Sequence, residues 1–333
     1  MMSALTPSHL PRLSARFLRV AGIVVSAASL GAVAWWAAHQ QAPRLPAGPR
    51  EIGAVVLAIV NYGLTTLVRG ERWRLLLRRA GARPSRADCQ ALTAVGYMGN
   101  NVLPARAGDV MRVYLMAPRA GAPARTVIGT LLAERVLDVV ILFALFGVLA
   151  YGVLHGAGVG HRRAEVVVVA LVAVAVVAAA GAVAARRVHA VQRLRRFLGP
   201  MLAAVVDLRS GFGLRMLALS ALIWLMEAGT WWLCGVAVGL GADPLQAVYL
   251  VALSSLFILI PAGPGYAGTL DAAVVVGVKA IGGTGRAAIS YLLMLRFVLL
   301  VPITLVGLLA LMVRYGGRAR LGVAWGTASE EAC

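Results

Sequence analysis

The sequence predicts an all-α polytopic membrane protein with about six full spans and two re-entrant helical hairpins. Its 333 residues are 60% hydrophobic and only 14% charged, with a mean hydropathy of +0.84. A soluble domain carries about 25% charged residues. Several apolar stretches approach the roughly 20 residues that cross the hydrocarbon core of a bilayer. We therefore expect one transmembrane domain over residues 18–313, with no separate soluble catalytic domain.

The apolar segments occur in the same order in two halves, over about 18–160 and 161–313. Full spans are expected over 18–38, 52–68, 127–154, 164–185, 216–240 and 287–313. Two pairs of shorter segments lie over 90–103 and 110–117, and over 245–260 and 267–281. These segments are too short to span singly, so each pair predicts a re-entrant hairpin. The alternative is that each pair forms two proline-kinked spans, which gives eight or more helices.

A break rich in proline and glycine separates the two segments of each pair. The first break reads NNVLPARAGD over residues 100–109, and the second reads LIPAGPGY over residues 259–266. Irregular backbone at membrane depth is costly unless it is buried in protein or lines a cavity. Corresponding breaks in two halves of a membrane protein point to a binding site at the interface of an inverted repeat.

Charge predicts the orientation of the chain. The net charge is +19, and Lys279 is the only lysine, so arginine supplies almost all of the positive charge. The arginines stand at the ends of apolar segments, which argues against nucleic-acid binding and follows the positive-inside rule. Three spans and one hairpin per half place both arginine-rich connections and both termini on one side. We expect an integral protein of the cell (inner) membrane, with cytoplasmic tails over 1–17 and 314–333.

Ionisable side chains within spans are the first candidates for function. Glu134 and Asp138 share a helix face and Arg135 is their neighbour, so one arginine could neutralise two carboxylates. A lipid phosphate could displace one of these carboxylates. The alternative is an internal ion cluster that only fixes helix packing.

Arg296 stands at the place in the second half that corresponds to Arg135. It has no acid near it in sequence, so Asp271 or Glu227 must be its partner. An arginine beside a break suits a phosphate or carboxylate head group, because guanidinium binds these groups through two hydrogen bonds.

The first break adds further candidate residues: Asn100, Asn101, Arg106, Asp109 and Arg112. The asparagines can satisfy backbone groups that the break leaves unpaired. Arg106 and Arg112 flank a helix start, and helix N-termini attract anions. For Arg112 the alternative is an interfacial position reached by snorkelling.

The second break adds Gly263, Gly265, Tyr266 and Thr269, followed by Asp271. The glycines permit close backbone approach and unusual dihedral angles, and the other two side chains supply hydroxyls. The histidines and cysteines form no metal-ligand pattern, and catalytic motifs are absent. We expect no metal, no cofactor and no enzymatic activity.

Several of these motifs together resemble one family. GYMGNNVLP at 96–104, GDVMR at 108–112, ERVLD at 134–138 and PAGPGYAGT at 261–269, with RWR at 72–74, are similar to the lysylphosphatidylglycerol synthase membrane domain, or flippase-like, family. The resemblance covers nearly the whole chain and implies an inner-membrane protein that moves a lipid between leaflets. Larger members add a cytosolic aminoacyl-tRNA-dependent transferase domain, which this sequence lacks, so synthase activity is not implied. Ala105 and the AGPG sequence at 262–265 depart from the family pattern and leave the lipid open.

We therefore expect a lipid flippase-like transporter for an anionic lipid or lipid-linked precursor. Its partners would be membrane lipids and a lipid-modifying enzyme or glycosyltransferase. One alternative is an accessory subunit that holds a lipid-linked substrate for such an enzyme. A membrane-embedded transferase ranks last, because its general base would be Glu134 or Asp138, and an adjacent arginine would keep either ionised and weakly basic.

Overall fold

The computed structural model describes residues 31, 35, 38, 39, 41–103, 106–154, 211–257 and 264–316. Within these ranges the regular structure is eight α-helices and one 3-10 turn, so the predicted all-α class is confirmed. The expected span over 164–185, nearly all of that over 18–38, the N-terminal tail and most of the C-terminal tail lie outside the described residues. Gly263 and the centre of the first break, residues 104 and 105, lie outside them as well.

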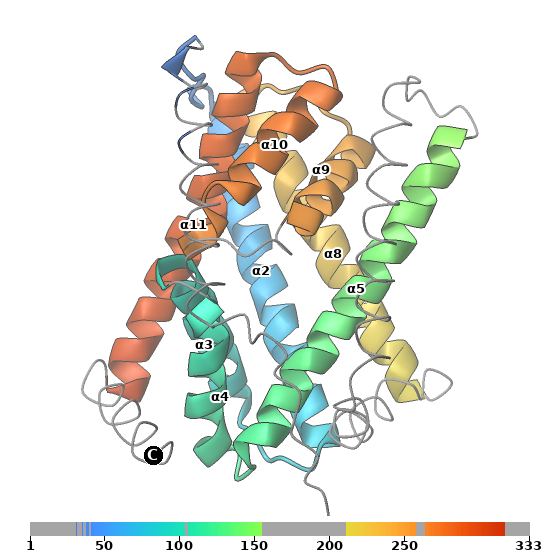
Figure 1. Ribbon diagram of the computed structural model, residues 1–333. Helices are drawn as coiled ribbons and strands as arrows, with labels where there is room; N and C mark the ends of the chain where they lie inside the picture. The colour runs from blue at the N-terminus through green and yellow to red at the C-terminus, as the bar shows by residue number, and fades with distance from the viewer. Residues whose placement is uncertain are drawn as a thin grey trace, which may run out of the picture.

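Four long helices run most of the height of the molecule: α2 (Pro49–Arg79), α5 (Ala124–Leu154), α8 (Gly211–Val238) and α11 (Gly285–Tyr315) (Figure 1). Among the described residues α2, α8 and α11 are each long and apolar enough to cross a membrane. Their 28 to 31 residues correspond to about 42–46 Å of helix, more than the roughly 30 Å of a bilayer core. Apolar side chains such as Leu305, Leu309 and Val313 on α11 are 62–78% exposed, as expected for a helix that faces lipid.

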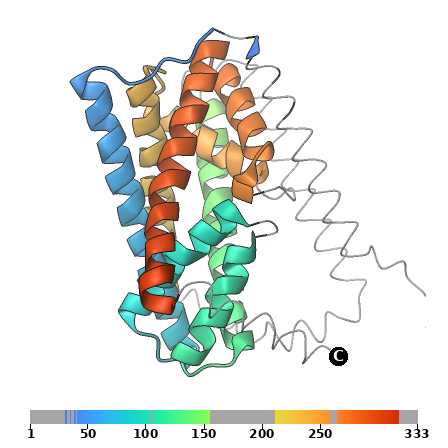
Figure 2. The same ribbon diagram turned by 90° about the vertical axis from the view of Figure 1, so that its left-hand side faces the viewer.

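Two pairs of short helices lie where the sequence predicts hairpins. The first pair is α3 (Arg86–Val102) and α4 (Ala107–Arg119); the second is α9 (Pro244–Phe257) and α10 (Thr269–Ala280), with the 3-10 turn η2 (Pro264–Tyr266) before α10. As described, these helices have 12 to 17 residues, fewer than the roughly 20 typical of a transmembrane helix. Both views show α3 and α4 beside the lower half of the long helices and α9 and α10 beside the upper half (Figures 1 and 2).

Left-handed backbone conformations mark both breaks. Arg106, the N-cap of α4, has φ 55° and ψ 37°. In the second break Gly265 has φ 59° and Tyr266 has φ 55°. Positive φ is uncommon for a residue with a side chain. The first break therefore holds Arg106 in a strained conformation, and the second break holds Tyr266 in one.

Glycine lets the first hairpin close. A Cβ atom at Gly108 of α4 would lie 1.9 Å from the carbonyl oxygen of Gly96 in α3, and one at Gly99 would lie 2.6 Å from the Cα of Gly108. A glycine also allows close contact between α11 and α3, because a Cβ at Gly307 would lie 2.4 Å from the carbonyl oxygen of Ala94. Small residues allow membrane helices to approach this closely, and the hairpin is thereby held against α11.

We expect Gly108→Ala to lower the free energy of unfolding by about 1–3 kcal/mol, because the new methyl group meets backbone that cannot rotate away. Thermal unfolding of the detergent-solubilised protein would measure this loss. The matched control is Gly63→Ala in α2, where nothing lies within 4 Å of the added Cβ. An equal unfolding temperature for the two variants would show that the α3–α4 contact is looser than described.

Candidate functional site

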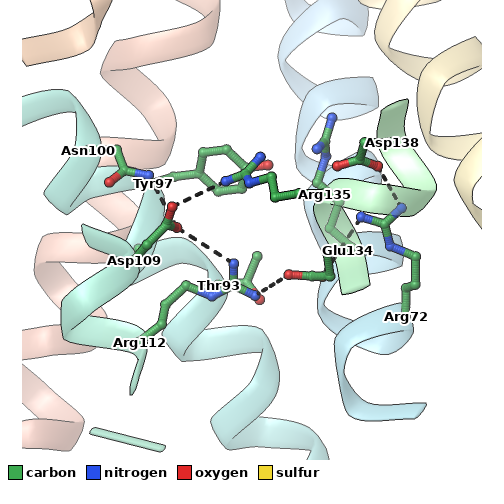
Figure 3. A pocket seen from close by; sticks show the side chains of 11 residues that line it. Arg72, Thr93, Tyr97, Asn100, Asp109, Arg112, Glu134, Arg135 and Asp138 are labelled. Atoms are coloured by element: carbon green, nitrogen blue, oxygen red, sulfur yellow. Dashed lines mark hydrogen bonds and ion pairs between the residues drawn. The ribbon is translucent and has the colours of Figure 1, made fainter. Parts of the chain in front are cut away.

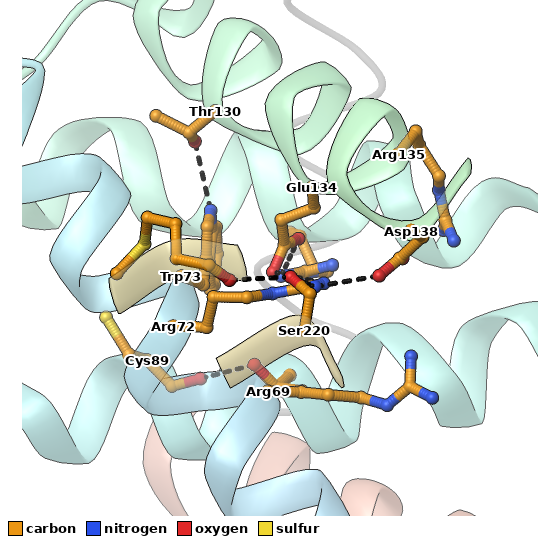
Figure 4. A network of polar contacts seen from close by, with 12 residues as sticks. Arg69, Arg72, Trp73, Cys89, Thr130, Glu134, Arg135, Asp138 and Ser220 are labelled. Atoms are coloured by element: carbon orange, nitrogen blue, oxygen red, sulfur yellow. Dashed lines mark hydrogen bonds and ion pairs between the residues drawn. The ribbon is translucent and has the colours of Figure 1, made fainter. Parts of the chain in front are cut away.

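A buried arginine on α2 joins three long helices. Arg72 is 1% exposed, and its Nη1 donates to Asp138 Oδ1 on α5 and to Ser220 Oγ on α8, both at 2.7 Å (Figure 4). Its Nη2 lies 3.8 Å from Glu134 Oε1, also on α5. The cation is therefore paired within the protein, as a charge at membrane depth requires.

The next residue forms a platform for a second arginine. Trp73 is fully buried, and its Nε1 donates to Thr130 Oγ1 on α5 at 3.0 Å. The guanidinium of Arg112, from α4, lies over the indole ring with its Cζ 4.0 Å from the centroid, a cation–π contact. Arg112 Nη2 donates to Glu134 Oε2 at 3.0 Å. The Glu134 carboxylate thus lies between Arg72 and Arg112.

A third arginine pairs with an acid of the first hairpin. Arg135 Nη2 donates to Asp109 Oδ2 at 3.2 Å, across the space between α5 and α4 (Figure 3). Asp109 Oδ1 is 3.9 Å from Arg112 Nη1 and 3.5 Å from Asn100 Nδ2. The side chains of Arg135 and Asp109 are 49% and 27% exposed, so this pair is more open than the other two.

Two sequence-based interpretations are corrected by this geometry. The expectation that Arg135 neutralises both Glu134 and Asp138 is wrong: Arg72 and Arg112 pair with these acids, and Arg135 pairs with Asp109. The snorkelling alternative for Arg112 is also wrong, because the residue is 7% exposed and bound to Glu134.

These groups surround one cavity, which we call the polar pocket. Its charged lining consists of Arg69, Arg72, Arg112, Arg135, Asp109, Glu134 and Asp138. Arg69 Nη2 donates to Glu227 Oε2 at 3.0 Å, so each of the four arginines has a carboxylate partner. The free volume is about 20 Å³, enough for about one water molecule. Among the described residues, the Nε–H groups of Arg72 and Arg112 are buried without a hydrogen-bond partner.

The candidate residues of the second break form a separate cluster. Arg296 Nε donates to Asp271 Oδ1 at 2.7 Å, and its Nη1 and Nη2 donate to the carbonyl oxygens of Gly265 and Tyr266. Asp271 also accepts from the backbone N–H of Gly268 at 2.8 Å, and Thr269 Oγ1 donates to the Tyr266 carbonyl at 3.3 Å. Of the two acids proposed from the sequence, Asp271 is therefore the partner of Arg296.

The second cluster does not line the polar pocket, but the two breaks are in contact. The Arg106 guanidinium of the first break lies 5.4 Å from the ring centroid of Tyr266 in the second. Asn101 Nδ2 donates to Thr304 Oγ1 on α11 at 3.0 Å. The breaks are thus adjacent, as the sequence predicts for a repeat interface.

The acid–arginine pairs occupy corresponding positions in the two halves. Asp109 and Asp271 are each the third residue of the helix that follows a break. Arg135 and Arg296 are each the twelfth residue of the following 31-residue helix, α5 or α11. The separations along the chain are 26 and 25 residues. The Asp–Arg separation of 25 or 26 residues is therefore visible in the sequence, but only when the two halves are compared, because the partners lie on different helices.

Sequence reasoning missed Arg69, Arg72 and Ser220 as part of the site. Both arginines lie at the end of an apolar run, where arginine usually anchors a helix to the interface. Their spacing of three residues places them on neighbouring positions of one helix face. In the structure that face is turned toward the pocket.

The fold and the site together define an integral membrane protein of the all-α class, with a buried network of ion pairs between its helices. The chain belongs to the family described as the lysylphosphatidylglycerol synthase TM region, whose model matches residues 17–307. It is also similar to a protein named Glycosyltransferase AglD from Haloferax volcanii, with 26% identity over 366 aligned positions. That alignment covers 96% of this chain and 57% of the relative, so the chain spans little more than half of the relative's length. No solved structure matches the chain.

We expect Arg72→Gln to lower the free energy of unfolding by about 3–5 kcal/mol, because Asp138 loses its closest cation and remains buried. Chemical or thermal unfolding in detergent would measure the change. Arg78→Gln, on the exposed last turn of the same helix, is the matched control and should stay within about 0.5 kcal/mol of the parent protein. If both variants unfold alike, Arg72 does not hold α2, α5 and α8 together.

Proposed function

We propose that this protein moves an anionic lipid, or an anionic lipid-linked precursor, between the leaflets of the membrane. The observation that carries this proposal is the polar pocket, which is lined by four arginines and three carboxylates from the helices α2, α4 and α5. Ionisable groups within a membrane are costly and rare, and they are therefore candidates for a functional site by default. Guanidinium groups suit phosphate head groups in particular, because they form two parallel charge-assisted hydrogen bonds.

In this proposal the head group enters the polar pocket while the acyl chains stay in the bilayer. Arg112 and Arg135 bind the head group, and Arg72 and Arg69 keep their carboxylate partners. Asn100 and Asn101 stabilise the first break through their side-chain hydrogen bonds. The Asp271–Arg296 pair stabilises the second break, which includes Gly265, Tyr266 and Thr269. The acids keep the arginines paired while no lipid is bound.

Movement of the two halves against each other would alternate access to the site. The positions of the hairpins at opposite ends of the long helices (Figures 1 and 2) and the corresponding Asp–Arg pairs support an inverted repeat. The Arg106–Tyr266 contact would couple the two hairpins. In the same proposal both termini face the cytoplasm and the hairpins are re-entrant.

Transport by the purified protein is expected to depend on Arg135. In vesicles containing a fluorescent phosphatidylglycerol, Arg135→Gln should slow movement between leaflets at least about tenfold, since a charged hydrogen bond is worth about 1.5–3 kcal/mol. A dithionite quenching assay measures the rate. Arg125→Gln on the same helix is the control, because Arg125 is exposed at the start of α5. Equal rates for the parent protein and folded Arg135→Gln would refute the assignment.

A second candidate is an accessory subunit that presents a lipid-linked substrate to a glycosyltransferase. The observation that favours it is the similarity to a relative that is named a glycosyltransferase and is considerably longer than this chain. This candidate predicts stable co-purification with such an enzyme from native membranes, and no lipid movement by the isolated protein. Lipid movement without any partner would favour the transporter instead.

A further inference from the structure

We propose that Asp109 is the exchangeable counter-ion of the polar pocket, and that a phosphodiester head group with a single negative charge replaces it. The Asp109 carboxylate holds Arg112 and Arg135 until the phosphate of a lipid arrives. The inference rests on the proposed function and adds the chemical class of the ligand and the residue with which it competes.

The small free space among the charged side chains favours an exchange. About 20 Å³ is free among the charged side chains, which accommodates about one water molecule. A phosphate group does not fit beside all three carboxylates, so one of them must leave its arginines. The replaced carboxylate is the one whose contacts are weakest.

The three carboxylates differ clearly in how firmly they are held. Asp138 accepts from Arg72 at 2.7 Å and its side chain is 9% exposed. Glu134 accepts from Arg112 at 3.0 Å and its side chain is 8% exposed. Among the described residues, the polar contacts of Asp109 are at 3.2, 3.5 and 3.9 Å, and 27% of its side chain is exposed. Charge-assisted hydrogen bonds are strongest at about 2.7–2.9 Å, so Asp109 is the most readily displaced.

Displacing Asp109 frees donors that a phosphate can use. Asp109 is attached to α4 through a short side chain and reaches Arg135 but stays 3.9 Å from Arg112 Nη1. The phosphate of a bound lipid is not restrained by a side chain of α4, so it can lie between the guanidinium groups of Arg112 and Arg135. Arg112 offers, in addition, an Nε–H group without a partner among the described residues, on a side chain that is nine-tenths buried. Asn100 Nδ2 is released with the carboxylate.

Charge balance selects the phosphodiester. One carboxylate leaves the arginines and one negative charge takes its place, so the charge that faces Arg112 and Arg135 is unchanged. Glu134 and Asp138 stay with Arg112 and Arg72. An uncharged head group would leave Arg135 without its carboxylate partner, which is costly within a membrane.

Removing the competing charge should tighten binding. We expect Asp109→Asn to bind short-chain phosphatidylglycerol at least about tenfold more tightly than the parent protein, equivalent to 1.4 kcal/mol. Isothermal titration of the full chain in a maltoside detergent, which contains no phosphate, measures this. The variant should also transport the lipid more slowly, because release becomes limiting. Arg135→Gln differs, since both its affinity and its transport rate should fall.

The controls separate the charge from other effects. Asp243→Asn removes a carboxylate from a position at the start of α9, outside the pocket, and should leave the affinity unchanged. Asp109→Ser also removes the charge, so it must shift the affinity in the same direction if Asp109→Asn fails to fold. Short-chain diacylglycerol, which lacks the phosphate, should not bind more tightly to either variant.

Each result bears on a different claim. Unchanged or weaker phosphatidylglycerol binding by both Asp109 variants would overturn the exchange, even if the parent protein binds the lipid. Tighter binding of inorganic phosphate alone would overturn the lipid as its source. If the parent protein binds no phosphatidylglycerol, or if Arg135→Gln binds it equally well, the proposed function itself fails.

Discussion

The buried guanidinium of Arg72 is the constraint to which the neighbouring helices conform. An unpaired buried charge is strongly unfavourable, and Arg72 is only 1% exposed. Asp138 and Ser220 bind it from α5 and α8 at 2.7 Å. Separating α2 from α5 would leave buried charges unpaired, and moving α8 away would cost Arg72 its hydrogen bond to Ser220. We therefore regard α2, α5 and α8 as one rigid unit at the level of Arg72.

Two ion pairs of different strength attach the first hairpin, α3 and α4, to this unit. Arg112 of α4 is held firmly, between Trp73 and Glu134, whereas Asp109 on the same helix reaches Arg135 only at 3.2 Å. In the second half the corresponding arginine is fully occupied, because Arg296 binds Asp271 and two carbonyl groups of the break. Equivalent positions thus hold one loose and one tight ion pair. The looser of the two pairs belongs to the polar pocket.

Sequence reasoning located the helices and the breaks because both depend on local chemistry. Apolar runs and their proline and glycine interruptions predicted α3, α4, α9 and α10 close to their observed limits. The choice of Arg135 as partner for Glu134 and Asp138 failed, because it applied a rule for neighbours on one helix. Successive residues project about 100° apart, so Arg135 reaches Asp109 on α4, Asp138 reaches Arg72 on α2, and Glu134 lies between Arg72 and Arg112. The rotation of each helix and the angles at which helices cross decide which helix lies opposite a given face. These quantities cannot be derived from a single sequence.

Electroneutrality explains why the polar pocket is built from pairs and not from arginines alone. A pocket of four unpaired guanidinium groups would attract anions strongly but could not be kept within a bilayer, since each charge would have to be buried without compensation. The carboxylates remove this penalty and at the same time occupy the positions of a ligand. In the proposed exchange of anions, the free energy of binding is a difference between two sets of hydrogen bonds. A small difference is what a transporter needs, because a head group that is bound too firmly is never released.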